Sequence, residues 1–349
     1  MKILHLLSSN QFSGAENVAC QIISMFKGKA DYDMVYCSPD GKIRTALDQR
    51  SIPFQPLKKM NCHNLRSIIK QYKPDLIHAH DVRASILAAK FSRSCRIISH
   101  IHNNHMGMRK ISLKSLLYFI TLPKYKHIFW VSQSAYDSFY FKNAAKDKSS
   151  ILYNTINIQE LQTRVATDQN DYTFDIVHIG RLTHQKNPQR LIEVLRLCIG
   201  KMPNLQCAVI GDGELRQEVE ALILQHGLEN NIHLLGYRNN PAKILQSAKV
   251  MLLVSRYEGT PMCALEAMAL GVPIVSTPTD GMCELVDDGE TGFLSNNDSL
   301  LAEHVVNIVN DIDLYRTLST HTKKRGNELL NTKTYSEKIQ KIYTQGVMS

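Results

Sequence analysis

The sequence predicts an α/β protein made of two doubly wound, Rossmann-like domains. Short apolar segments alternate with amphipathic helical patterns along the first half of the chain, and the same alternation starts again in the second half. Alternation of this kind favours parallel sheets with helices packed on them. The polar stretch 162–172 separates the two series, and 349 residues exceed what a single hydrophobic core usually spans.

The first series contains five apolar segments that we predict to be buried strands: Ile3–Leu7, Asp33–Cys37, Leu76–His78, Ile97–Ile101 and Ile128–Val131. Between them, apolar residues recur at a spacing of three to four, which predicts amphipathic helices. These helices are expected at Glu16–Phe26, Leu65–Gln71 and Arg83–Phe91.

The second series begins after the polar stretch, with strands expected at Asp175–Gly180, Gln206–Ile210, Ile232–Leu235, Val250–Leu253 and Pro273–Ser276. A helix is expected at Pro188–Ile199, and a last helix at Tyr335–Val347 follows the series and is expected to pack back onto the first domain. We therefore expect one domain over 1–160 together with 335–349, and a second domain over 161–334.

Composition places the chain among soluble globular proteins, with 44% hydrophobic and 21% charged residues. The apolar run at the N-terminus is too short for a secretory signal, and the segment 111–131 is broken by lysines and a proline. The eight cysteines are scattered without a C-x-x-C pair, which favours reduced thiols. We expect a cytoplasmic protein, with peripheral attachment to the inner face of the cell membrane as a further option.

The net charge of +9 is unevenly distributed along the chain. Residues 1–165 hold 24 Lys and Arg against 10 Asp and Glu, whereas residues 166–349 hold 17 against 22. A basic first half indicates either an anionic partner, such as a phosphate-bearing lipid or a membrane surface, or an ordinary solvated surface. Nucleic acid is not expected as a partner, because aromatic stacking motifs and a groove-reading helix are missing.

The strongest functional signal lies directly after the apolar strand that ends at Val254. Two carboxylates, Glu258 and Glu266, stand eight residues apart, the first in a Gly/Thr/Pro turn and the second in the helix that follows. In open α/β sheets, ligands bind beyond the carboxyl ends of the strands. Glu258 is therefore placed to accept hydrogen bonds from sugar hydroxyls, and Glu266 to reach a ribose. The exposed backbone of the turn formed by Gly259, Thr260, Pro261 and Met262 is placed to hold an anionic phosphate at the start of the helix.

This stretch resembles the E-x7-E motif of retaining glycosyltransferases with the GT-B fold, in particular glycosyltransferase family 4. The resemblance implies two Rossmann-like domains that face each other across a cleft and bind a nucleotide sugar between them. A second segment, 180–188, is similar to the G-R-L…K motif of this family, which grips the donor's diphosphate and makes a divalent metal unnecessary. In this chain the motif supplies Gly180, Arg181 and Lys186, whose two cations can neutralise a leaving diphosphate.

Two weaker segments occur in the order of the family. Gly211 follows the strand Gln206–Ile210, and Tyr237 and Arg238 follow the strand Ile232–Leu235. Both segments resemble loops near the nucleotide base, although glycine-rich turns after strands are common in α/β proteins.

In the first half, Gly14 lies in a turn between a strand and a helix, where backbone amides could meet a phosphate or the transferred sugar. The family more often has two adjacent glycines here, and Ser13 replaces the first. His102 ends the strand Ile97–Ile101 and resembles the histidine of this family that faces the donor sugar, with His105 as a rival on the following loop. His100 should point to the same face as His102 and lie deeper.

The pair His78 and His80 shares one strand face, as two metal ligands would. The sequence suggests no third or fourth ligand nearby, so we interpret this pair as structural and expect neither a metal nor a cofactor.

The resemblance as a whole implies transfer of a hexose or N-acetylhexosamine, with retention, from a nucleotide sugar that is most commonly linked to uridine diphosphate. The basic first half favours a glycan or polyprenyl-diphosphate-linked acceptor in capsule, lipopolysaccharide or other polysaccharide synthesis. Glu258, His102, Arg181 and Lys186 are the expected catalytic residues. Two alternatives stay open: a nucleotide-sugar 2-epimerase on the same fold, and a non-catalytic partner subunit of the same architecture.

Overall fold

The computed structural model describes residues 1–102 and 106–345, and within these ranges the side chains of Met106 and Asp280 are not described. The chain divides into two compact units, the first comprising Met1–Asn154 and Thr332–Ser349 and the second Thr155–Asn331. The boundary lies a few residues before the expected one at 160/161. In the described part of the chain, no helix is long and apolar enough to cross a membrane.

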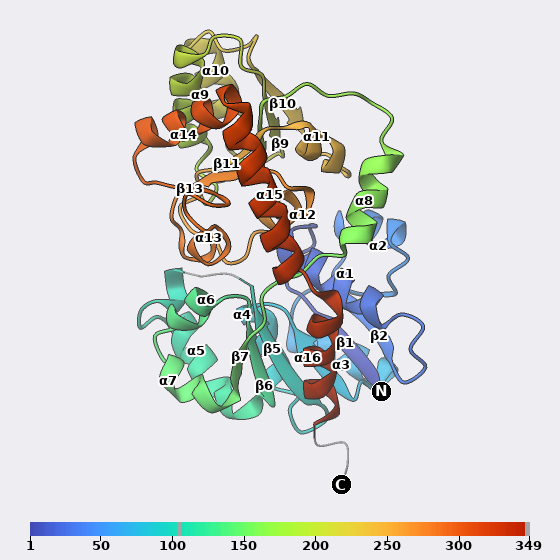
Figure 1. Cartoon of the computed structure of the whole chain (residues 1–349). Helices are drawn as coiled ribbons and strands as arrows, with labels where there is room; N and C mark the ends of the chain where they lie inside the picture. The colour runs from blue at the N-terminus through green and yellow to red at the C-terminus, as the bar shows by residue number, and fades with distance from the viewer. Residues whose placement is uncertain (103–105, 346–349) are drawn as a thin grey trace. The chain divides into compact units, whose positions relative to one another are not determined.

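The first unit, drawn blue to green in Figure 1, contains a sheet of seven described strands in the order β3-β2-β1-β4-β5-β6-β7, all parallel to their neighbours. The strands are β1 (Lys2–Leu6), β2 (Asp33–Pro39), β3 (Phe54–Leu57), β4 (Leu76–Ala79), β5 (Arg96–Ile101), β6 (His127–Trp130) and β7 (Ser149–Ile151). This arrangement confirms the predicted doubly wound parallel sheet.

Helices connect these strands and cover the sheet. They are α1 (Gly14–Phe26), α2 (Ile43–Gln49), α3 (Cys62–Tyr72), α4 (Val82–Ala89), α5 (Leu113–Thr121), α6 (Gln133–Asp137) and α7 (Lys142–Ala145), with short 3₁₀ turns at Met106–Met108, Leu122–Lys124 and Lys146–Lys148. The last helix, α16 (Thr332–Thr344), drawn dark red in Figure 1, packs against α1. Its buried Tyr343 donates or accepts a hydrogen bond of 2.7 Å with Nδ1 of His78, so this helix completes the core of the first unit.

The second unit contains a parallel sheet of six described strands in the order β10-β9-β8-β11-β12-β13. The strands are β8 (Ile176–Ile179), β9 (Cys207–Ile210), β10 (Ile232–Gly236), β11 (Val250–Leu253), β12 (Ile274–Ser276) and β13 (Gly292–Leu294). Two hydrophobic clusters contain residues that alternate along β9 and β11, so one cluster lies on each face of the sheet.

The helices of this unit are α8 (Ile158–Thr167), α9 (Pro188–Lys201), α10 (Arg216–Gln225), α11 (Ala242–Ser247), α12 (Met262–Leu270), α13 (Asp280–Leu285), α14 (Asp298–Asn310) and α15 (Ile312–Leu329). Helix α8 covers part of the polar stretch 162–172, in which the sequence analysis expected no helix. Asn157 caps its first turn by accepting a hydrogen bond from the backbone of Glu160, and Leu161 is buried in the core of the second unit.

Three strands were missed by the sequence analysis: β3, β7 and β13. Each lies at the edge of its sheet and is only three or four residues long, and most of its residues are partly exposed. Such short edge strands carry little of the continuous apolar pattern by which buried parallel strands are recognised.

Candidate functional site

Two loops of the second unit meet at the carboxyl ends of neighbouring strands. The loop 180–187 follows β8, and the loop 254–261 follows β11, which is the next strand in the sheet. Nζ of Lys186 on the first loop lies 2.5 Å from Oε1 of Glu258 on the second. The two side chains are only 13% and 6% exposed, so this ion pair is nearly buried. The two strongest sequence signals therefore converge on one point.

Further hydrogen bonds fix both loops before any ligand is present. The hydroxyl of Ser255 donates to Oε1 of Glu258 at 2.6 Å, and the side-chain amide of Gln185 donates to the carbonyl of Tyr257 at 3.0 Å. The backbone N–H of Arg256 donates to the carbonyl of Gln185 at 2.9 Å. The Glu258 carboxylate is thus held in a defined orientation, as a binding group must be to act without costly reorganisation.

The charges at this point are set by burial and by the ion pair. Burial alone would lower the pKa of Lys186, but the Glu258 carboxylate outweighs it, and the pKa of Lys186 is raised above its ordinary value. Burial lowers the pKa of the neighbouring His178 to about 4 and raises that of the Cys263 thiol to about 11. At neutral pH, Lys186 is therefore a cation, while His178 and Cys263 are uncharged.

Several glycines allow the loops of this edge to approach each other. A Cβ atom at Gly211 would lie 1.9 Å from the carbonyl oxygen of Gly180, and Gly211 also has a φ of +138°. A Cβ atom at Gly281, in α13, would overlap the carbonyl oxygen of Gly259. Gly180 and Gly211 are thus brought into direct contact, and the turn containing Gly259 is packed against α13.

Glu266 lies in the second turn of α12 and is nearly buried. Its Oε1 accepts a hydrogen bond of 2.9 Å from Nη2 of Arg164, which projects from α8. Gly259, Thr260 and Pro261 are buried just before this helix, Met262 begins it, and the N-cap residue Pro261 supplies no side-chain hydrogen bond to its first turn. Glu266 and the first turn of α12 are therefore neighbours on the same helix.

The other predicted residues of this unit also follow strands at this edge of the sheet. Arg181 is exposed on the same loop as Lys186. Tyr237 and Arg238 are exposed after β10, which β9 separates from β8. The side chain of Tyr237 donates to Oδ1 of Asn239 at 3.2 Å.

In the first unit, the predicted residues also lie where strands end. Gly14 begins α1, and a Cβ atom there would meet nothing within 4 Å, so its backbone is open on that side. The hydroxyl of Ser13 donates to Oε2 of Glu16 at 2.5 Å. His102 directly follows β5 and is 7% exposed, while His100 is completely buried. His105, the rival to His102, lies outside the described residues.

The structure corrects one premise of the sequence analysis of the histidine pair, namely that no further candidate ligand lies nearby. His78 and His80 are not isolated, because His5 on β1 and His100 and His102 at β5 lie beside them. His80 Nδ1 forms a hydrogen bond of 3.1 Å with His102 Nε2. This grouping could not be recognised from the sequence, because its histidines come from three separate strands.

Other residues at the site were also missed. Arg164 was assigned to the polar linker, although the spacing of Ile158, Leu161 and Val165 is the helical signal that could have placed it. Ser255 follows a buried strand directly, and that position was the available signal for it.

Comparisons with known proteins agree with this geometry. Residues 160–325 match the family described as Glycosyl transferases group 1, and residues 12–160 match Glycosyltransferase Family 4. An uncharacterized glycosyltransferase of Methanocaldococcus jannaschii is 31% identical over 248 residues, which are 64% of this chain and 60% of that protein. The chain thus spans less than two thirds of that relative's length.

An Escherichia coli protein named UDP-Gal:alpha-D-GlcNAc-diphosphoundecaprenol alpha-1,3-galactosyltransferase is 23% identical, with 98% of this chain and 95% of that protein covered. The crystal structure of Anabaena HepE in complex with UDP-glucose has the same fold, with a TM-score of 0.85, 22% identity and 99% of each chain covered. The two matched families, the two parallel sheets and the loops at their carboxyl ends together show that this chain belongs to the family 4 glycosyltransferases of the GT-B fold.

Proposed function

We propose that this protein transfers a hexose or N-acetylhexosamine, with retention of configuration, from a uridine diphosphate sugar to a glycan or polyprenyl-diphosphate-linked acceptor. The observation that carries the proposal is the nearly buried pair of Lys186 and Glu258 on neighbouring loops. A buried cation beside a fixed carboxylate offers both groups that a sugar diphosphate requires: a positive charge for the phosphate and a hydrogen-bond acceptor for sugar hydroxyls.

Each residue has a role in this mechanism. Lys186 uses one of its three N–H groups for Glu258 and has the others for phosphate oxygens. The exposed Arg181 adds a second cation, so that the two stabilise the diphosphate as the bond to the sugar breaks. Glu258 orients the sugar, and Glu266 binds the ribose. The acceptor hydroxyl passes its proton to the departing phosphate oxygen, so neither carboxylate acts as a nucleophile and no metal ion is required.

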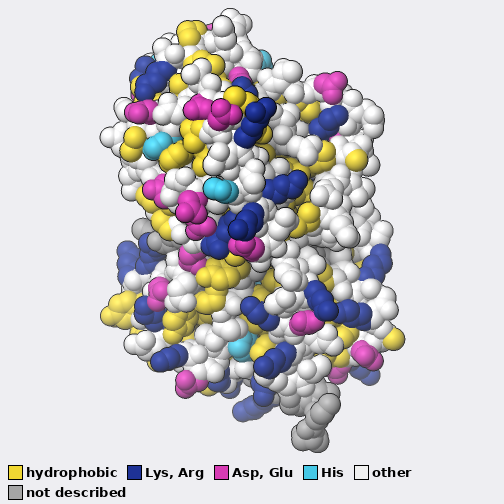
Figure 2. Space-filling model, in the orientation of Figure 1, with side chains coloured by type: hydrophobic (Ala, Val, Ile, Leu, Met, Phe, Trp, Pro, Cys, Tyr) yellow, Lys and Arg dark blue, Asp and Glu magenta, His cyan; other side chains and the backbone are white. Residues whose placement is uncertain are grey.

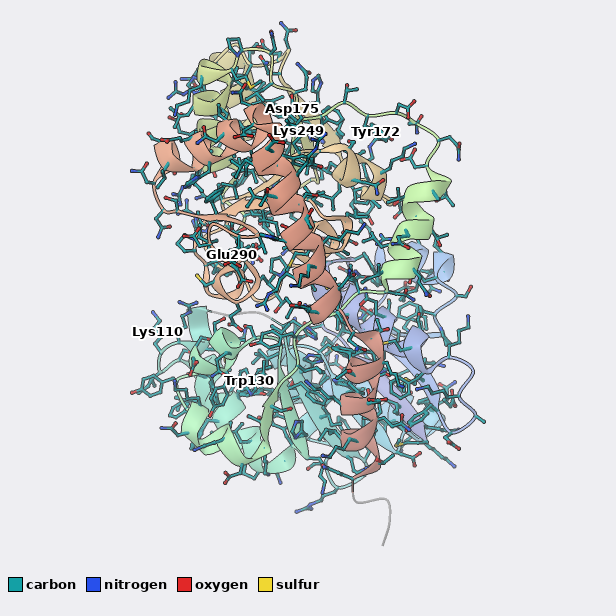
Figure 3. All side chains as sticks on the ribbon, in the orientation of Figure 1. Lys110, Trp130, Tyr172, Asp175, Lys249 and Glu290 are labelled. Atoms are coloured by element: carbon teal, nitrogen blue, oxygen red, sulfur yellow. The ribbon has the colours of Figure 1, made fainter. Side chains whose placement is uncertain are left out.

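The matched control for this site lies on the same two strands at their opposite ends. Asp175 precedes β8 and Lys249 precedes β11, and Nζ of Lys249 lies 3.5 Å from Oδ1 of Asp175 (Figure 3). We expect Lys186→Met and Glu258→Gln to lower kcat about 100-fold or more, as loss of a charge-stabilising group does. Lys249→Met should leave kcat unchanged. Near-normal rates in both site variants would refute the assignment.

The assay should measure release of uridine diphosphate from a panel of its sugars, with and without a polyprenyl-diphosphate-linked glycan. Acceptor-dependent release and a product of unchanged anomeric configuration, read by NMR, support retaining transfer. Conversion of the donor sugar without acceptor would instead identify a 2-epimerase. Binding of the donor without either reaction would identify a non-catalytic partner. An unchanged rate in excess EDTA is expected if the metal is dispensable.

A lipid-linked acceptor requires access to a membrane surface, and the surface around α5 in the first unit has the composition for it. Ile111, Leu113 and Ile120 are 59%, 76% and 67% exposed. Cations surround them at Arg109 and Lys110, and Figure 3 shows Lys110 pointing outward. In Figure 2, hydrophobic and basic side chains lie beside one another over this region. Exposed apolar side chains together with cations are typical of helices that lie in a membrane interface.

Sedimentation with anionic vesicles at low salt tests this surface. The double variant Leu113→Gln and Ile120→Gln should lose most of its vesicle binding, because two exposed apolar side chains no longer enter the interface. Leu224→Gln is a matched control, since Leu224 is 68% exposed on α10 of the second unit. Equal binding by all three proteins would refute the membrane assignment and leave the transferase assignment intact.

A further inference from the structure

His178 is a buried histidine of the second unit that the proposed mechanism does not use. It lies on β8, where the other three residues are Ile or Val, and it is 1% exposed. In the sheet, β9 lies on one side of β8 and β11 on the other. Open α/β sheets bind their ligands beside the strand at which the strand order reverses, and β8 is that strand here. His178 is therefore a polar residue in the interior directly below the candidate site.

The imidazole of His178 lies where β8 and β11 separate. The register pairs of these two strands end with Val177 and Met251, whereas β8 stays paired with β9 as far as Ile179. Directly after the last pair, Nδ1 of His178 lies 2.9 Å from the carbonyl oxygen of Leu252 on β11. The side chain thus continues the contact between the two strands by one residue beyond their backbone pairing.

This hydrogen bond fixes the tautomer of His178. A carbonyl oxygen can only accept, so Nδ1 carries the proton and donates. Burial lowers the pKa of His178 to about 4, so the ring is neutral at physiological pH. Nε2 is therefore an acceptor, and it is buried without a hydrogen-bond partner among the described residues. An unpaired buried acceptor is costly, and joining two strands does not by itself account for it.

Nε2 of His178 lies beside the side chain of Lys186. A Cβ atom at Gly180 would be 3.0 Å from this nitrogen and 3.4 Å from Cδ of Lys186, so both atoms lie against the bare face of Gly180. Besides burial, which is the largest cause, the charge of Lys186 lowers the pKa of His178 and that of Glu258 raises it. The unpaired acceptor is therefore close to the cation of the site.

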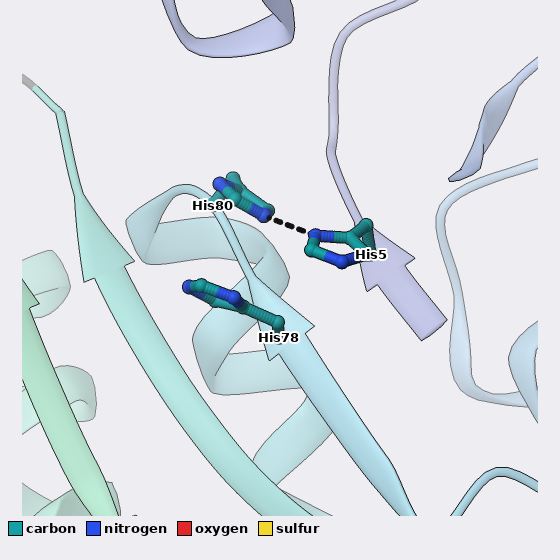
Figure 4. A group of neighbouring side chains, drawn as sticks. All are labelled: His5, His78 and His80. Carbon is teal, nitrogen blue, oxygen red and sulfur yellow. Dashed lines mark hydrogen bonds between the residues drawn. The ribbon is translucent and has the colours of Figure 1, made fainter. Parts of the chain in front are cut away.

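Three buried histidines of the first unit show a different arrangement, because their rings bond to one another. Nδ1 of His5 lies 2.9 Å from Nε2 of His80 (Figure 4), and Nδ1 of His80 lies 3.1 Å from Nε2 of His102. In this histidine chain, each bond joins a nitrogen of one ring to a nitrogen of the next. His178 instead has the side chain of Lys186 beside its open nitrogen.

Binding of a sugar diphosphate changes the hydrogen bonds available to Lys186. In the ligand-free protein, Oε1 of Glu258 accepts hydrogen bonds from both Lys186 and Ser255. Sugar hydroxyls that bind Glu258 compete for the same carboxylate. Lys186 then needs another acceptor for this N–H if its ammonium group is to stay in place.

We propose that His178 is a positioning residue that acts through Lys186: its Nε2 accepts an N–H of the ammonium group when a sugar diphosphate binds, and so holds the cation against the phosphates. The inference rests on the proposed function, which places the diphosphate at Lys186. The competing interpretation is that His178 only joins β8 to β11. In that case, any variant that keeps the bond to Leu252 would bind the donor normally.

Two amide variants separate the two nitrogens of the ring. The short side chain of His178→Asn places an N–H donor near the position of Nδ1, which keeps the bond to Leu252 but removes Nε2. The longer side chain of His178→Gln places an acceptor oxygen near the position of Nε2 but gives up that bond. We expect His178→Asn to weaken binding of uridine diphosphate about tenfold in isothermal titration calorimetry, with little change in its thermal unfolding midpoint. His178→Gln should show the reverse, with a lower midpoint and an affinity close to that of the unsubstituted protein.

A double-mutant cycle tests whether the effect passes through Lys186. In the Lys186→Met background, His178→Asn should change the affinity for uridine diphosphate less than about twofold, because the partner of Nε2 is already missing. Uridine, which has no phosphate, should bind to His178→Asn as it binds to the unsubstituted protein. His233→Asn is the matched control, since His233 lies on β10 of the same sheet and its Nε2 lies 2.8 Å from Oε1 of Gln206. This control should leave the affinity unchanged.

The outcomes distinguish this inference from the proposed function. Normal affinity for uridine diphosphate in His178→Asn would overturn the positioning role, and so would equal losses with and without Lys186. Losses of affinity that follow the losses of stability in both amide variants would establish the competing structural role. If Lys186→Met itself leaves the affinity for uridine diphosphate unchanged, the placement of the diphosphate at Lys186 fails, and the proposed function fails with it.

Discussion

We expect five buried histidines of the first unit, His5, His78, His80, His100 and His102, to make its stability sensitive to mild acid. Burial lowers the pKa values of His5 and His102 from 6.5 to about 3 and those of His78, His80 and His100 well below 6.5. The unfolded chain therefore binds more protons than the folded one below pH 6.5. The contribution of each histidine is complete above that pH and is lost as the pH falls toward the folded-state pKa.

The size of the effect follows from the difference in bound protons. When the pH is lowered from 7.5 to 5.5, the free energy of unfolding falls by about 1.4 kcal/mol for each histidine that stays neutral in the folded state. For five such histidines the decrease is about 7 kcal/mol, which is comparable to the entire stability of many domains. Most carboxylates have pKa values near 4 and stay ionised over this range. The histidines should therefore dominate the change.

Trp130 provides an assay specific to this unit. It is the single tryptophan of the chain, it is 1% exposed, and Figure 3 shows it within the first unit. Urea unfolding followed by its fluorescence should show a much lower midpoint at pH 5.5 than at pH 7.5. Over the same pH range, the free energy of unfolding of His100→Phe should fall by about 1.4 kcal/mol less than that of the unsubstituted protein. A midpoint that does not depend on pH would refute the reasoning.

Two further predictions concern the second unit. Gly281→Ala should destabilise it by several kcal/mol, because the new methyl group would overlap the carbonyl of Gly259, as seen in thermal unfolding. Gly200→Ala, in α9 with open space around it, should instead be neutral or stabilising, and equal effects of the two would contradict this packing argument. Arg164→Met should weaken donor binding by about tenfold through the loss of orientation of Glu266, with kcat affected less. An unchanged donor Kd in isothermal titration calorimetry would show that the Arg164–Glu266 pair is only structural.

Much of the fold was predictable because buried parallel strands are continuous apolar runs. The strands around Ile3, Ile97 and Val250 were found for this reason, while β7, with two serines among its three residues, was not. The helix α8 was missed because its buried face is narrow and only Leu161 is fully covered. Edge position and partial exposure remove the periodic signal on which such predictions depend.

The candidate site was predictable where both partners of a contact lie in recognisable motifs. Lys186 and Glu258 follow neighbouring strands, and their convergence follows from the order of the strands. The contact of Glu266 with Arg164 was not predictable, because it depends on how α8 packs against other helices of the second unit, such as α11. The histidine chain depends on ring orientation across three strands, which residue spacing does not specify.

The position of α16 has a consequence for synthesis of the protein. Tyr343 and His78 are 265 residues apart in sequence, yet they contact each other in the interior of the first unit. On the ribosome, the sheet of that unit emerges long before the helix that covers part of it. The core of the first unit therefore stays incomplete while residues 155–331 are synthesised. During that time its exposed apolar surface is a binding site for chaperones.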